Sequence, residues 1–151
     1  MAQPIEFERF DDEYAGKIVG RTSKRGVDAY LGITVTELTA GRLVAGFEAR
    51  EELITPLGSM HGGCLSALVD HCLGVIMYPV MPPGYWVATT EFKINLLAPV
   101  SGGTCVATAE IRSMSRRLAV VGISVENAGR LVALAQGTCT IVAPRQPSPS
   151  P

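Results

Sequence analysis

The chain has 151 residues, of which 47% are hydrophobic and 18% are charged, and its formal net charge is −1. This length fits one domain, and the apolar content is enough for a core with further burial in an oligomer. A surface that binds nucleic acid must be basic, so the even balance of 13 Lys and Arg against 14 Asp and Glu argues against a nucleic-acid partner.

Residues 1–29 form a mixed, charged N-terminal segment. Within it, Phe7, Phe10, Tyr14 and Ile18 follow a three- and four-residue spacing, which predicts a short amphipathic helix. The first residues contain neither a basic region nor an apolar stretch, unlike a signal peptide. We therefore expect a cytoplasmic protein.

Two strands are predicted next, over 30–39 and 42–50, with a glycine turn between them. A loop over 51–60 follows. The apolar stretch after it predicts a helix over 63–77, which prolines then end. Because a charged residue lies near its centre, this stretch is interpreted as a buried helix and not as a membrane span.

From Trp86 onward apolar and polar residues alternate, which predicts four more strands. In the first of them, Ala88 and Phe92 are expected to face inward. The four strands are expected over 86–97, 104–113, 118–125 and 131–142.

Six strands joined by short turns, with one apolar helix between the second and third, predict an α+β fold. In this fold an antiparallel sheet covers the helix, and the domain spans 30–143. The tail over 144–151 is rich in Pro and Ser and is expected to be disordered.

The cysteines show no CxxC pair, which favours small apolar core residues in a reducing compartment over disulfides or a metal site. They are Cys64, Cys72, Cys105 and Cys139.

The most informative segment is 61–70, where a two-glycine turn leads into the helix and one carboxylate follows. The unpaired N–H groups of a helix start, here at Gly62 and Gly63, can hold a developing oxyanion. Asp70 offers a general base or a nucleophile in an apolar helix. The competing interpretations are a simple tight turn for the glycines and a structural pairing of Asp70 with His71 or an arginine.

The two histidines have different expected roles. His61 is a candidate catalytic base, although a role in shaping the turn is preferred because no carboxylate is near it in sequence. His71 points about 100° away from Asp70 around the helix and is expected to pack or to lie at an interface. The spacing does not match a metal site, so none is predicted.

The distance between the two chemical groups predicts an assembly. Asp70 lies seven residues after Gly63, about 10 Å along a helix axis, so one helix cannot place both groups on one carbonyl. Two antiparallel copies can, which predicts a homodimer with shared sites. An apolar wall for a substrate is expected from Leu65, Leu68, Val69 and Cys72.

These motifs resemble the hotdog-fold acyl-CoA thioesterases of the phenylacetate-pathway (PaaI-like) type. The residues that carry the resemblance are His61-Gly62-Gly63, the Leu68-Val69-Asp70 triplet on the helix, the strand Thr89 to Pro99, and the Arg116 to Val120 stretch. The similarity spans about 30–142.

The resemblance implies a hotdog fold that dimerises edge to edge, and a dimer of dimers. It implies that the Gly62 N–H polarises a thioester carbonyl, that Asp70 of the partner subunit activates water or attacks, and that Thr89 helps to hold the water. No cofactor beyond the acyl-CoA substrate is implied. Arg116 and Arg117 are candidates for the phosphates of CoA, and a solvated strand start is the equal alternative.

Three further positions, Gly63, Ser66 and Thr90, complete the expected substrate-binding set. Thr55 belongs to it as well, and it departs from the family pattern, because some relatives have Asn there. Two alternatives stay open: a hotdog hydratase or dehydratase of acyl thioesters, and a non-catalytic acyl-CoA-binding protein.

Overall fold

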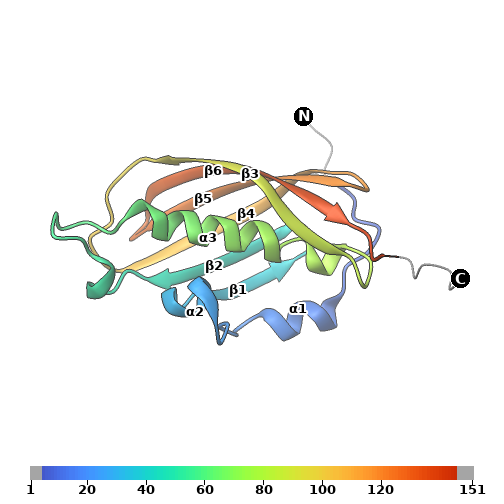
Figure 1. Ribbon diagram of the computed structural model, residues 1–151, viewed down its shortest axis with the longest axis horizontal. Helices are drawn as coiled ribbons and strands as arrows, with labels where there is room; N and C mark the ends of the chain where they lie inside the picture. Colours follow the sequence, from blue (N-terminus) through green and yellow to red (C-terminus); the bar gives the residue numbers. More distant parts are fainter. Residues whose placement is uncertain (1–4, 146–151) are drawn as a thin grey trace, which may run out of the picture.

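The structure is a computed structural model that describes residues 5–145. Six strands form one antiparallel sheet in the order β1-β2-β4-β5-β6-β3, and the long helix α3 lies across one face of it (Figure 1). The predicted α+β fold, with the helix between the second and third strands of the chain, is confirmed. The elements are α1 (Asp12–Ile18), α2 (Gly26–Leu31), β1 (Thr34–Thr39), β2 (Arg42–Glu48), α3 (Gly62–Val75), β3 (Trp86–Leu96), β4 (Thr104–Met114), β5 (Leu118–Asn127) and β6 (Arg130–Val142), with short 3₁₀ turns at Glu51–Leu53 and Tyr78–Val80.

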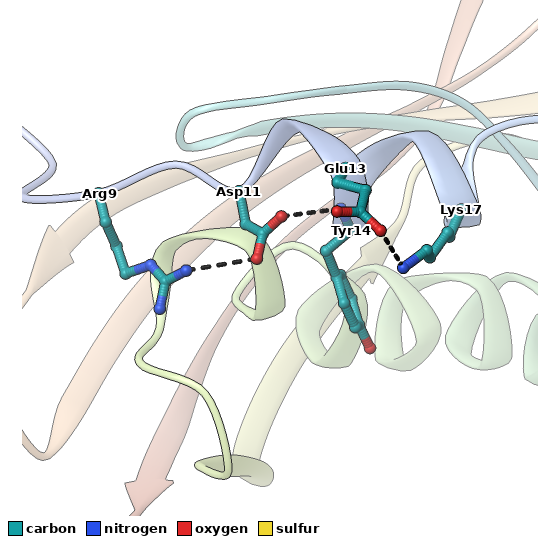
Figure 2. Close-up of polar contacts among 5 residues, drawn as sticks. All are labelled: Arg9, Asp11, Glu13, Tyr14 and Lys17. Atoms are coloured by element: carbon teal, nitrogen blue, oxygen red, sulfur yellow. Dashed lines mark hydrogen bonds and ion pairs between the residues drawn. The ribbon is translucent and has the colours of Figure 1, made fainter.

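Helix α1 is shorter than the apolar spacing predicted, because a side-chain cap sets its start. Oδ1 of Asp11 accepts the N–H of Tyr14 at 2.9 Å, and the other oxygen pairs with Arg9 at 3.3 Å (Figure 2). One turn further on, Glu13 and Lys17 form an exposed ion pair at 2.6 Å. The helix lies beside β1, at the edge of the sheet (Figure 1).

The prediction that the first strand begins at Tyr30 is wrong. Residues up to Leu31 belong to α2, which ends at Gly32 in the left-handed conformation (φ 75°). The strand therefore starts only at Thr34. The tail predicted over 144–151 lies outside the described residues, apart from its first two positions.

Strand β3 occupies an edge of the sheet, beside β6, and it contains a bulge. Thr89 is paired with Cys139 and Glu91 with Thr138, so Thr90 is the extra residue. The bulge changes which residues of β3 face the helix. Sequence alternation alone could not place it.

The expectation that Ala88 faces inward is wrong for this reason. Val87 is the buried residue before the bulge, and Phe92 packs against the core after it. Thr89 shares the inward side with Val87, which brings its hydroxyl to the α3 side of the sheet.

Helix α3 packs closely on β6 because Gly137 has no side chain. A Cβ at Gly137 would lie only 2.7 Å from Cδ1 of Leu73. The adjacent Cys139 thiol donates to the Leu73 carbonyl at 3.4 Å. The Gly62–Val80 stretch has the length and mean hydropathy (1.4) of a membrane span, yet α3 is the core helix of the sheet, as predicted.

All four cysteines are free, and three of them are buried, which confirms their interpretation as core residues. Burial raises the pKa of Cys72 to about 12. It also raises the pKa of Cys105 and of Cys139 to about 11.

Candidate active site

The start of α3 exposes one backbone donor. His61 is the N-cap, and its Nδ1 accepts the N–H of Gly63 at 2.9 Å. The N–H of Cys64 donates to the His61 carbonyl at 3.0 Å. Within residues 5–145, the N–H of Gly62 has no acceptor. The first turn thus leaves the Gly62 N–H available to a ligand, and His61 shapes the turn.

Asp70 is exposed in the single chain, in contrast to the apolar surroundings expected from its position in the helix. Its neighbour His71 does not pair with it. Instead, Nδ1 of His71 lies 3.7 Å from Oδ2 of Asp28 on α2. Burial lowers the pKa of His71, and the charge of Asp28 opposes that shift.

Asp70 and Thr89 lie on the same hollow between α3 and the edge strand β3. The hollow has a volume of about 510 Å³ and is also lined by the bulge residues and Phe92. After burial, the charge of Asp70 is the next cause that raises the pKa of Cys139, the residue paired with Thr89. Within the described residues, the Thr89 hydroxyl has no hydrogen-bond partner in the protein. The structure therefore brings together the predicted carboxylate and the predicted hydroxyl.

The other predicted hydroxyl groups are bonded within the chain. Thr55 donates to the carbonyl of Ser59 at 2.8 Å. Ser66 donates to the Gly62 carbonyl at 3.2 Å. The Thr90 hydroxyl lies 2.6 Å from that of Thr140 on β6. These residues shape the loop, the helix and the bulge in the single chain.

Gly62 lies on a second hollow, of about 230 Å³, at the other end of β3. A Cβ at Gly62 would lie 2.4 Å from Cδ1 of Leu96, so this leucine covers the glycine. The hollow shares no lining residue with the one around Asp70. A single chain therefore keeps the oxyanion donor and the carboxylate apart, as the helix length predicts.

The predicted apolar wall needs correction. Leu68, Val69 and Cys72 are fully buried under the sheet and face no hollow. Of the predicted set only Leu65 lines the space around Gly62. The sequence interpretation missed the other apolar side chains there, although an apolar pair at the end of a strand was a visible signal. They are Met60, Leu96, Leu97 and Val100.

Arg116 and Arg117 lie in the β4–β5 turn, at the end of the molecule away from the start of α3 (Figure 1). Both are exposed, and within residues 5–145 neither forms an ion pair. They line a hollow of about 850 Å³.

A curved antiparallel sheet with α3 on its inner face defines a hotdog fold, and the Gly62 and Asp70 hollows lie along its free edge. The thioesterase superfamily model matches residues 57–134, which contain α3, β3 and both candidate groups, and the chain belongs to this family.

Two characterised relatives are acyl-CoA hydrolases by name. The chain is 25% identical over 127 residues to human acyl-coenzyme A thioesterase 13, covering 82% of this chain and 89% of the relative. It is 29% identical over 85 residues to 1,4-dihydroxy-2-naphthoyl-CoA hydrolase of Listeria monocytogenes, covering 56% of this chain and 69% of that protein.

Solved structures show the same fold. A mutant thioesterase of Pseudomonas aeruginosa superposes with a TM-score of 0.78 at 21% identity, covering 90% of this chain and 97% of that one. The E. coli PaaI protein from the phenylacetic acid degradation operon gives a TM-score of 0.70 at 25% identity, covering 76% and 83%. The resemblance to PaaI-like hotdog thioesterases is thereby confirmed, and the protein is a thioester hydrolase.

Proposed function

We propose that the protein hydrolyses a short-to-medium-chain or aromatic acyl-CoA to the free acid and CoA. The observation that carries this proposal is the set of groups left unbonded along β3: the Gly62 N–H, the Asp70 carboxylate and the Thr89 hydroxyl. The Gly62 N–H would stabilise the oxyanion of the thioester. Asp70 would activate water or attack the carbonyl directly, and Thr89 would orient the water.

The free edge of β3 supports a shared site between two copies. Gly62 lies against Leu96, and Asp70 lies beside the Thr89–Phe92 stretch. When two β3 edges pair antiparallel, Leu96 of one copy meets Thr90 of the other if the two-fold axis passes near Lys93. This pairing would place Gly62 beside Asp70 of the partner subunit, and the second copy would cover the exposed carboxylate.

The acyl class is inferred from the hollow around Gly62. It is small, and its side chains are mostly apolar, including Met60, Leu65 and Leu97. An apolar lining with one polar donor is typical of a site that holds a hydrocarbon group and orients a carbonyl. Two such dimers would form the expected tetramer.

We also propose that the protein acts in the cytoplasm, because free, buried thiols suit a reducing compartment. The proposed reaction uses no metal or cofactor, so EDTA is expected to leave the rate unchanged.

A coupled thiol assay over a panel of acyl-CoAs tests the proposal. Wild-type protein should release CoA, and Asp70→Asn should lower kcat by about 10²-fold or more, the usual scale for loss of a general base. Asp12→Asn on α1 is the matched control and should keep full activity. Normal turnover by folded Asp70→Asn would overturn the role of Asp70.

The same panel separates the alternatives. Loss of the enoyl absorbance of an unsaturated acyl-CoA without thiol release would indicate a hydratase. Calorimetric binding of acyl-CoA with neither reaction would indicate a binding protein. The free carboxylate and hydroxyl beside β3 favour hydrolysis over mere binding.

A further inference from the structure

The β4–β5 turn holds two cationic side chains in a fixed place. Ser115 locks the turn, because its N–H donates to the Leu118 carbonyl at 2.8 Å and its hydroxyl accepts the Leu118 N–H at 3.2 Å. The Arg117 carbonyl accepts the N–H of Ile141 on β6 at 2.8 Å. The backbone that carries Arg116 and Arg117 is therefore ordered before any ligand arrives, which lowers the entropic cost of binding.

The hollow beside this turn combines cationic, aromatic and hydroxyl side chains. It is lined by the two arginines, Tyr85, Thr140 and the end of β6, and its volume is about 850 Å³. Its charge is local, since the whole chain has a net charge of −1. Glu6 lies with Arg116 on a separate, neighbouring hollow, and no ion pair joins them within the described residues. Two adjacent guanidinium groups without carboxylate partners suit a ligand with several phosphate charges.

We infer that this hollow binds the 3′-phosphorylated adenosine diphosphate end of CoA, with the arginines on its phosphates and Tyr85 against the base. The inference rests on the proposed function, which supplies the thioester end at Asp70.

The distances along the sheet fit such a ligand. Arg117 lies two strands and about two residues away from Thr89, roughly 12 Å from strand geometry. The pantetheine arm has about the length of four extended residues, roughly 14 Å. An arm of that length can join the hollow at Arg117 to the one at Asp70 of the same chain.

The only tryptophan of the chain provides a direct readout. Trp86 is 52% exposed and is paired with Val142, which lines the hollow. Its fluorescence should therefore change when a nucleotide binds there. We would titrate the protein with CoA, adenosine 3′,5′-bisphosphate, pantetheine and inorganic phosphate, and measure each Kd by fluorescence and calorimetry.

CoA and the bisphosphate should bind and change the Trp86 emission, whereas pantetheine and phosphate at equal concentration should not. The double substitution Arg116→Ala with Arg117→Ala should raise the Kd of the bisphosphate at least tenfold. The pair Lys24→Ala with Arg25→Ala removes the same charge from an exposed segment before α2 and should leave that Kd unchanged.

Three results would overturn the inference: equal binding of the bisphosphate by the double arginine variant, equal binding of pantetheine and CoA, or phosphate alone competing as well as the bisphosphate. The two proposals fail separately. If acyl-CoA is hydrolysed but the bisphosphate does not bind at the arginines, the nucleotide site is wrong and the proposed function stands. If the bisphosphate binds there but no thioester is hydrolysed, the reverse holds.

Discussion

The N–H of Gly63 donates to Nδ1 of His61 at 2.9 Å, and this bond decides which donor of the first turn of α3 stays free. An imidazole nitrogen that accepts a hydrogen bond carries no proton, so in neutral His61 the proton lies on Nε2. The cap removes the Gly63 N–H from use by a ligand. The Gly62 N–H is left as the donor for an oxyanion.

Two substitutions at Gly62 separate the donor from the space around it. Gly62→Pro removes the N–H, and proline is tolerated at the first position of a helix. His61 has φ −62° and ψ 133°, which suits a residue that precedes proline. We expect kcat to fall by about 10²- to 10³-fold, as on removal of an oxyanion donor.

Gly62→Ala is the matched variant, because it adds a Cβ against Leu96 but keeps the N–H. It should retain much more activity than the proline variant in steady-state thiol-release assays, with folding checked by circular dichroism. Equal kcat values for the two variants would show that space, and not the donor, matters at this position.

Mixing of defective subunits tests the shared site. Asp70→Asn and Gly62→Pro subunits, unfolded together and refolded, should form mixed dimers with one intact site. Random association would restore roughly a quarter of the wild-type activity, because half of the dimers are mixed and each has one working site. Two differently tagged batches of Asp70→Asn provide the control and should recover nothing. If mass spectrometry verifies mixed dimers that stay inactive, both groups must act within one chain.

His71 should make stability depend on pH between 7 and 5. Burial lowers its pKa in the folded protein below the ordinary value near 6.5. As the pH falls through that value, the unfolded chain binds a proton first, so the free energy of unfolding decreases. The slope for one proton is at most about 1.4 kcal/mol per pH unit. Asp28 does not contribute in this window, because a Ser23 hydrogen bond lowers its carboxyl pKa and it stays ionised.

Urea unfolding at several pH values measures this effect. The His71→Gln variant should lose less stability than the wild type between pH 7 and 5. Parallel curves for the two proteins would contradict the assignment to His71.

The thiols should differ in reactivity in the folded protein. Cys72 has a pKa of about 12, and Cys105 and Cys139 about 11, so at pH 8 few of these buried groups are thiolates. Cys64 is only partly buried, and burial raises its pKa as well. Iodoacetamide should therefore label Cys64 first, and all four cysteines equally fast in guanidinium, as read by peptide mass spectrometry. Early labelling of Cys72 would mean that α3 opens readily.

Local patterns in the sequence determined the elements and the candidate groups. Alternation in β3 to β6 and the apolar run of α3 reflect side chains that contact the core within a few residues of one another. The glycine pair at Gly62 and the carboxylate at Asp70 could be found in the same way, because a helix start and its spacing are local properties.

Only the tertiary structure decided how these groups are arranged. It places β3 beside β6 at the sheet edge, puts a bulge at Thr90, and turns Thr89 toward Asp70. It also leaves Asp70 exposed and gives His71 to Asp28 on α2. These features depend on pairings between segments far apart in the chain, and neighbouring residues carry no signal for such pairings.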